Sequence, residues 1–276
     1  MHWENIFYVL SSVLFIFGIK RLSHPRTARS GNLIASMGML IAIVTTLVIS
    51  NSLSYELIGI GIIIGAIIGA FFAMRVEMTQ MPQMVAMFNG FGGIASALVA
   101  AAEFVNPSDS LSIFNLSTIS LSVFVGTLTF TGSFIAFGKL QGFVSGKPIV
   151  FPGQQLLNGL IASSIMGLAV YIVLFPNDLN YFYLLIAMSA VIGITLTIPI
   201  GGADMPVVIS LLNSYSGIAA ASTGFVLDNN ALIISGALVG ASGLILTNIM
   251  CKGMNRSLTN VIFGAVGLEQ DTGSDG

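Results

Sequence analysis

The sequence predicts an all-α membrane protein, a polytopic bundle of about nine transmembrane helices. Of its 276 residues, 55% are apolar and only 7% are charged, and the mean hydropathy is +0.96. A soluble domain carries about a quarter charged residues, so this composition excludes an ordinary globular enzyme, a disordered tail and a nucleic-acid binder. The apolar stretches are about twenty residues long, which suits membrane-spanning helices and is twice the length of a barrel strand.

Side chains that could hold a metal ion or a disulfide are scarce. The net charge of -2 leaves no basic surface for phosphates, and the single cysteine excludes a disulfide framework and a thiolate zinc site. His2 and His24 both lie near the N-terminus, which excludes a histidine-rich metal site. We predict no metal site and no nucleotide fingerprint, because Gly90, Gly92 and Gly93 fall inside an expected helix rather than between a strand and a helix.

Nine apolar stretches are each long enough to cross a hydrocarbon core of roughly 30 Å. The first has the length of a signal peptide, but its basic cluster follows the apolar run, so we expect a retained helix. The expected spans are 4–19, 31–50, 55–74, 81–104, 118–138, 155–175, 181–200, 205–226 and 230–250.

Every Lys and Arg falls on the same side of the membrane if the chain has nine spans. The loops on the other side carry only acids, such as Glu56, Asp109 and Asp178. The positive-inside rule then predicts an outside N-terminus and a cytoplasmic C-terminus. The basic residues are Lys20, Arg21, Arg26, Arg29, Arg75, Lys139, Lys147, Lys252 and Arg256.

We expect one transmembrane domain over residues 1–264, because no linker is long enough to divide the chain and no strong internal repeat is visible. Residues 265–276 are polar and too short to fold alone. They have the composition of a linker that begins to lead toward an absent cytoplasmic domain.

Polar residues inside the spans are the best candidates for function, because an unpaired polar group in hydrocarbon is costly. Asn89, Ser133 and Asn213 belong to the fourth, fifth and eighth spans. Counting at about 1.5 Å per residue from the inner end of each span puts all three roughly 9–11 Å below the cytoplasmic face. They could form one hydrogen-bonded cluster with a function, or they could simply bind the helices to one another.

Other candidates have a structural and a functional interpretation. Asp204 could cap the eighth helix or meet a cytoplasmic partner. The glycines of the third span (Gly61, Gly65 and Gly69) favour plain helix packing. Those of the ninth span, namely Gly236, Gly240 and Gly243, could serve packing or permit a small helix shift. No carboxylate lies near the middle of a span, so a carboxylate proton relay is not visible in this chain.

Several sequence blocks together resemble one family. The most specific is Gly201–Gly217, which reads GGADMPVVISLLNSYSG. The others are Val76–Thr79 with Met81-Pro82, Thr129–Ser133, Ala136–Leu140, Gly236–Gly240 and Met250–Ser257. These blocks resemble the membrane domain of the β subunit of proton-translocating NAD(P) transhydrogenase, and the similarity extends over nearly the whole chain.

The resemblance implies a role in a larger complex. Members transfer a hydride from NADH to NADP⁺ and couple this reaction to proton entry into the cytoplasm. An NAD-binding soluble subunit and an NADP-binding domain bind the nucleotides, so this chain alone would carry no hydride-transfer site and no cofactor. The resemblance further implies a dimeric complex in the bacterial cytoplasmic membrane.

The resemblance also implies roles for individual residues. Ser133 and Asn213 match the family's proton path, and we include Thr131 and Ser214 of the same spans. Asp204 matches an aspartate linked to communication with the NADP-binding domain, and Arg256 joins it as a coupling residue. The matched glycines are Gly236, Gly240 and Gly243.

Asn89 occupies a position where many relatives carry a protonatable histidine. An amide cannot take up a proton near neutral pH, whereas a histidine can. The resemblance implies a form of the enzyme in which a separate small membrane subunit, of the α type, supplies an intramembrane histidine, and we expect this chain to belong to that form. Two further interpretations remain, namely a self-contained secondary transporter and a passive membrane anchor, although no inverted repeat or intramembrane charge supports a transporter.

Overall fold

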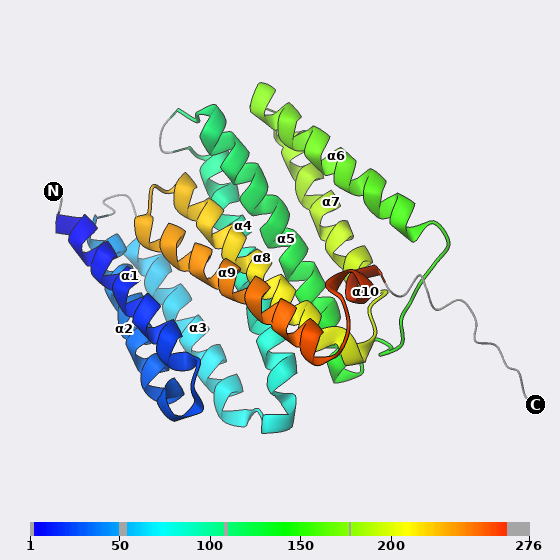
Figure 1. Cartoon of the computed structure of the whole chain (residues 1–276). Coiled ribbons are helices and arrows are strands. Elements are labelled where there is room, and N and C mark those ends of the chain that lie inside the picture. The colour runs from blue at the N-terminus through cyan, green and yellow to red at the C-terminus, as the bar shows by residue number, and fades with distance from the viewer. Residues whose placement is uncertain (1–2, 50–53, 108–109, 177, 264–276) are drawn as a thin grey trace, which may run out of the picture. The chain divides into compact units, whose positions relative to one another are not determined.

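The computed structural model describes residues 3–49, 54–107, 110–176 and 178–263, and these residues form helices joined by short connections (Figure 1). Nine of the helices are long and apolar enough to cross a membrane, which confirms the predicted bundle of spans for the part of the chain described. In chain order the elements are α1 (Trp3–Leu22), α2 (Pro25–Ile49), α3 (Tyr55–Arg75), η1 (Met78–Gln80), α4 (Met81–Val105), α5 (Ile113–Gln141), α6 (Gln154–Leu174), α7 (Leu179–Thr197), η2 (Gly202–Asp204), α8 (Met205–Val226), α9 (Asn230–Gly253) and α10 (Leu258–Phe263).

The helix ends follow from local sequence. Proline is favoured at the first helical position because it has no N–H to satisfy there, and α2 begins at Pro25, six residues before the expected span. Ser112 caps α5 by accepting a hydrogen bond from the Asn115 N–H at 3.1 Å. Gly142 ends α5 and Gly153 precedes α6, both with φ near +80°, a conformation that glycine adopts without strain.

Contacts divide the chain into two compact units, one of Met1–Met81 with Asn229–Ser235 and the other of Pro82–Asp228 with Gly236–Gly276. The predicted linker, 265–276, lies outside the described residues. The predicted side of the membrane for each terminus stays a prediction.

In the first unit, α1 and α2 form a tight antiparallel hairpin. Glycines allow the two backbones to approach, since a Cβ added to Gly31 would lie 2.8 Å from the Gly18 carbonyl oxygen. Ser11 Oγ donates to the Gly38 carbonyl oxygen at 2.7 Å, which adds a polar contact farther along the hairpin. By contrast, α3 buries no residue, and an added Cβ at Gly61, Gly65 or Gly69 would meet no atom of its own unit within 4 Å.

In the second unit, α5 is the central helix and contacts α6, α7 and α8. Its buried apolar residues include Ile119 and Val123, which are at most 1% exposed. Phe104 of α4 stacks on Phe182 of α7 with ring centroids 4.0 Å apart. A buried apolar core of this kind fixes the helices that carry the polar residues described below.

The hairpin contact makes a prediction about two glycines in the same unit. Gly31→Ala is expected to lower the thermal unfolding midpoint of the purified protein, because its Cβ would meet backbone atoms at 2.8 Å. The expected cost is about 1–3 kcal/mol, as for other overpacked positions. Gly61→Ala is the control, since it meets open space and alanine favours a helix. Equal midpoints for the two variants would contradict this account of the hairpin.

Candidate functional site

Asn89 joins three helices inside the second unit. Its Nδ2 donates to Oγ of Ser133 in α5 at 2.9 Å, and its Oδ1 accepts from Oγ of Ser216 in α8 at 2.8 Å. Asn89 is 9% exposed and Ser133 is fully buried. We call Asn89, Ser133 and Ser216 the Asn89 junction. An amide suits this position because it donates and accepts hydrogen bonds at the same time.

A second polar contact joins the same three helices farther along. Oγ of Ser122 in α5 lies 2.7 Å from Oγ1 of Thr223 in α8, and Thr223 Oγ1 lies 3.1 Å from the Ser96 carbonyl oxygen of α4. We call Ser96, Ser122 and Thr223 the Thr223 junction. Asn89 and Ser96 are seven residues apart in α4, and Ser216 and Thr223 are seven residues apart in α8. Seven residues correspond to roughly 10 Å along a helix.

Between these two junctions the backbones of α4 and α5 touch. A Cβ added to Gly93 would lie 2.8 Å from the Gly126 carbonyl oxygen, and a Cβ added to Gly126 would lie 3.0 Å from Ala97 Cβ. We call Gly93, Gly126 and Ala97 the glycine contact. Helices this close leave no space for a water molecule between their backbones at Gly93 and Gly126, which lie along α4 and α5 between the residues of the two junctions.

The structure brings together two of the three residues that we expected to cluster. Asn213 is half-buried and makes no side-chain hydrogen bond within the described part of the chain. Ser216, one turn farther along α8, lies beside Asn89 in the place expected for Asn213. No Asp, Glu or His side chain belongs to either junction.

The two other residues of the predicted path face different neighbours. Thr131 Oγ1 donates a hydrogen bond within its own helix, to the Thr127 carbonyl oxygen at 3.2 Å. The same side chain faces Gly193 of α7. Ser214 Oγ donates to the Gly240 carbonyl oxygen of α9 at 2.6 Å. Neither hydroxyl therefore belongs to the Asn89 junction.

The contact between α8 and α9 is built from glycines that are not equivalent. A Cβ added to Gly236 would run into the Ala221 backbone, and one added to Gly243 would lie 2.8 Å from the Ser214 nitrogen. A Cβ added to Gly240 would make only ordinary contacts, the nearest at 3.4 Å to the Ser214 carbonyl oxygen. Gly236 and Gly243 are thus required for close approach, while Gly240 leaves space for a methyl group.

Asp204 and Arg256 form an ion pair. Nη1 of Arg256 lies 2.6 Å from Oδ2 of Asp204, and the two side chains are 52% and 13% exposed. Asp204 occupies the cap position of α8, but its side chain makes no capping hydrogen bond. The ion pair therefore connects the start of α8 to the segment after α9. It brings together the two residues predicted to act in coupling.

Lys139, which the sequence suggested only as a topology marker, is a buried cation. Its Nζ donates to the carbonyl oxygens of Ile198 at 2.6 Å, Ile200 at 2.7 Å and Lys147 at 3.3 Å. The residue is 5% exposed and makes no ion pair among the described residues. Carbonyl groups at a helix C-terminus carry partial negative charge, so the end of α7 is a favourable place for this ammonium group. No sequence motif showed these partners, because they come from distant segments.

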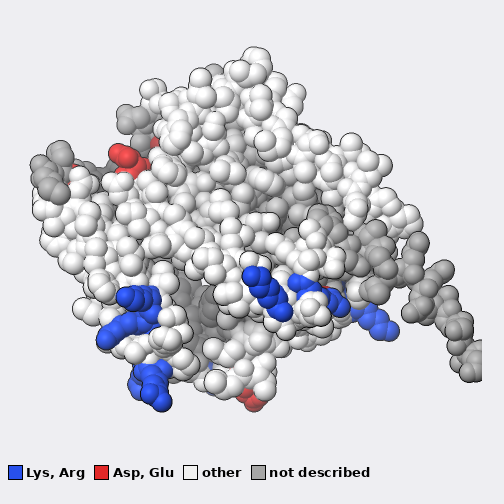
Figure 2. All heavy atoms as spheres, viewed as in Figure 1, with Lys and Arg blue, Asp and Glu red and all other residues white. Residues whose placement is uncertain are grey.

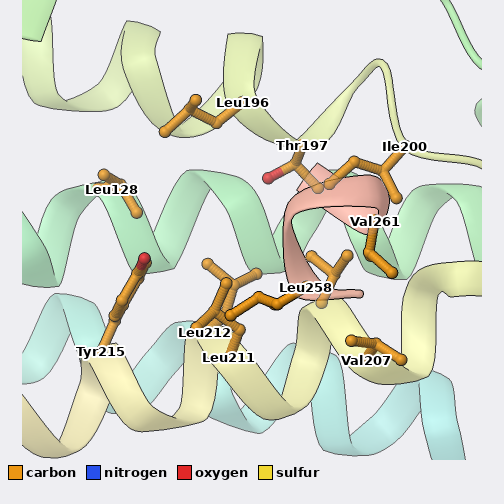
Figure 3. Close-up of a pocket in the computed structure, with 11 residues that line it drawn as sticks. Leu128, Leu196, Thr197, Ile200, Val207, Leu211, Leu212, Tyr215, Leu258 and Val261 are labelled. Atoms are coloured by element: carbon orange, nitrogen blue, oxygen red, sulfur yellow. The ribbon is translucent and has the colours of Figure 1, made fainter. Parts of the chain in front are cut away.

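A small cavity lies between α5, α7, α8 and α10 (Figure 3). Its volume is about 60 Å³, and its walls are apolar except for the hydroxyls of Thr197 and Tyr215. Neither hydroxyl has a hydrogen-bond partner among the residues described. Leu258 and Val261 of α10 line the side nearest the end of the described chain. The turn that brings α10 here passes through Asn255, whose φ is +52°.

The described residues form helices and their connections, and nine of the helices are long and apolar enough to cross a membrane. The arrangement defines a multi-pass helical membrane protein with paired polar groups between its inner helices.

Comparisons with known proteins identify the family. The profile of the family described as NAD(P) transhydrogenase beta subunit matches residues 4–276. The NAD(P) transhydrogenase subunit beta of Rhodospirillum rubrum is 47% identical over 269 residues, which cover 95% of this chain and 58% of the relative. A protein of the same name from a specific strain of that bacterium matches with the same identity and coverage. This chain belongs to the NAD(P) transhydrogenase beta subunit family, and it spans 58% of the length of these relatives.

The α8–α9 contact predicts different results for two glycines of α9. Gly243→Ala is expected to lower the thermal unfolding midpoint, because its Cβ would meet Ser214 backbone atoms at 2.8 and 2.9 Å. Gly240→Ala is expected to leave it unchanged. The measurement is the midpoint of each purified variant in the same detergent. If Gly240→Ala is as damaging as Gly243→Ala, steric contact does not explain these glycines.

The Lys139 contacts predict a loss of stability in the Lys139→Met variant. This change removes the ammonium donor from three carbonyl groups, of which that of Ile198 keeps the Ile149 N–H at 3.4 Å. An unpaired buried polar group costs about 1–3 kcal/mol. We expect a lower unfolding midpoint and faster proteolysis in the 142–153 connection. Lys147→Met, the same change at an exposed side chain in that connection, is expected to have no effect. Equal behaviour of the two variants would contradict a structural role for the Lys139 ammonium.

Proposed function

We propose that this chain is the proton-conducting membrane domain of a proton-translocating NAD(P) transhydrogenase. In the proposed reaction, hydride transfer from NADH to NADP⁺ is coupled to proton movement into the cytoplasm. The Asn89 junction is the observation that carries the proposal, because it gathers polar side chains where three helices meet inside a multi-pass protein of this family. Such groups favour a polar route over a purely apolar core.

The hydride chemistry is proposed to take place in other parts of the complex. NAD(H) would bind to a soluble subunit and NADP(H) to an NADP-binding domain, and we propose that this chain contributes no nucleotide site. The complex is proposed to be a dimer in the cytoplasmic membrane of a bacterium. The match to a subunit named beta, from Rhodospirillum rubrum, supports an assembly of several chains.

The proton itself needs a group that neither junction supplies. Asn89 already makes hydrogen bonds to Ser133 and Ser216, and amides and hydroxyls do not take up a proton near neutral pH. Asn213 is half-buried, and its amide has no hydrogen-bond partner among the described residues, so we propose that it bonds to a water chain or to a histidine of a small α-type membrane subunit. This proposal gives Asn213 a role in the path without a bond to Asn89.

The closed glycine contact supports a gated route rather than an open channel. Gly93 and Gly126 bring α4 and α5 together between the two polar junctions. We propose that a small separation of α4 and α5 admits water during turnover. The Asp204–Arg256 ion pair and α10 are proposed to transmit that change, because both connect the end of α9 to α8 or to the helices beside it.

Two other functions fit the helices less well. A self-contained secondary transporter would favour inverted repeats or an intramembrane charge pair, and neither is evident in the sequence. A passive anchor would account for the spans but not for the paired polar groups between α4, α5 and α8. The following two experiments separate these functions from the proposed one.

Asn213→Leu is expected to abolish coupled proton movement in vesicles that contain the complex, while assembly stays intact. Leucine has about the size of asparagine but can bond to neither water nor a histidine. Asn180→Leu, at an exposed position at the start of α7, is the matched control. Proton movement is followed with a pH-sensitive dye during hydride transfer. An anchor would tolerate both changes, so full coupling in Asn213→Leu would rule out the proposed path.

Ser216→Ala removes one hydrogen bond of the Asn89 junction. We expect coupled proton movement to fall about fivefold, which corresponds to one net hydrogen bond of roughly 1 kcal/mol. Ser163→Ala is the control, since that exposed hydroxyl bonds only to its own helix. An unchanged rate in Ser216→Ala, with normal amounts of inserted protein, would show that the junction is structural only.

A further inference from the structure

The connecting end of the α1–α2 hairpin carries a group of exposed cations. Lys20 and Arg21 lie in the last turn of α1, and Arg26 and Arg29 lie near the start of α2. All four side chains are exposed, and none makes an ion pair with another described residue. Figure 2 shows blue side chains gathered at this end of the hairpin. The surface defined by these four residues is called the hairpin cluster.

The backbone holds these cations in a fixed arrangement. Ser23 Oγ donates to the Lys20 carbonyl oxygen at 2.7 Å, and Thr27 Oγ1 donates to the Arg21 carbonyl oxygen at 2.7 Å. Gly31 lets the start of α2 lie against α1, since a Cβ there would be 2.9 Å from Arg21 Cβ. These contacts fix the backbone of the turn that carries the four cations.

Helix stability does not explain why two of these residues are cationic. The N-terminus of a helix carries a partial positive charge, so cations in its first turns are unfavourable. The first turn of α2 contains no acidic residue that would offset Arg26 and Arg29. Arg75 differs, because it lies at the C-terminal end of α3 with its guanidinium 5.2 Å from the centre of the Phe71 ring. The hairpin cluster thus favours a negative group from outside the chain.

The adjoining surface is apolar. Phe17, Leu22 and Leu33 flank the cluster and are 56%, 44% and 64% exposed. Both α1 and α2 qualify as membrane spans. A ligand that fits cations beside exposed apolar side chains has a negative head and hydrocarbon chains, which describes an anionic phospholipid.

We propose that the hairpin cluster binds the phosphate headgroup of an anionic phospholipid, with the acyl chains lying along α1 and α2. Arg26 and Arg29 would donate to the phosphate through their guanidinium groups. Lys20 and Arg21 would add charge from the neighbouring helix. This site is independent of the proposed proton path.

The test measures which lipids wild type and variants retain. Each is purified as the full chain with the subunits that co-purify with it. The protein is exchanged into micelles with equal amounts of phosphatidylglycerol and phosphatidylcholine, and bound lipid is counted by native mass spectrometry. We expect wild type to prefer phosphatidylglycerol. Because each cation near an anionic lipid contributes several-fold, Arg26→Gln/Arg29→Gln should reduce that preference about tenfold. Arg26→Lys/Arg29→Lys should retain most of it.

Arg75→Gln/Lys252→Gln is the matched control, since it removes the same number of positive charges from residues outside α1 and α2. Loss of preference in the hairpin variant alone supports the site. Unchanged preference in the hairpin variant, or an equal loss in the control, overturns it. A second arm measures thermal stabilisation by phosphatidylglycerol and by inorganic phosphate at equal concentration. Equal stabilisation by inorganic phosphate also overturns the assignment to a lipid.

Discussion

The need to pair every polar group in an apolar interior governs this structure. Inside a membrane an unpaired amide or hydroxyl has no water to bond with. The chain meets this need by placing polar side chains where several helices meet, as at Asn89, or by bonding hydroxyls to their own helix, as at Thr131. Even the Lys139 ammonium is satisfied by backbone carbonyls. Groups without a partner in the described part of the chain, such as the Asn213 amide, are therefore informative.

The same constraint bears on how a proton could cross the chain. The Asn89 and Thr223 junctions are each closed by hydrogen bonds within the protein, and the glycine contact lies between them. A proton could not move along such a line of paired groups without water or a titratable partner. The proposed proton path therefore requires two changes during turnover. One is separation of α4 from α5, and the other is entry of water or of a partner's side chain near Asn213.

Much of the fold could be predicted from apolar run length alone, and all nine expected spans correspond to helices in the described residues. The site could be predicted only in part, because counting residues gives depth along a helix but not direction around it. Asn213 and Ser216 differ by three residues, or about 60° around the helix, and Ser216 is the one that reaches Asn89. Ser133 and Thr131 face different helices for the same reason. The Lys139 contacts and the α10 cavity depend on long-range packing that no local pattern contains.

We propose that the glycine contact between α4 and α5 closes the polar route until the two helices separate. The most direct test is the passive proton permeability of vesicles that contain the complex with Gly93→Ala or the bulkier Gly93→Val. Gly92 is the matched control, because a Cβ there would meet open space. If the glycine contact closes the route, the Gly93 variants leak protons faster than the same changes at Gly92. Equal leak rates, with equal amounts of correctly inserted protein, would contradict it.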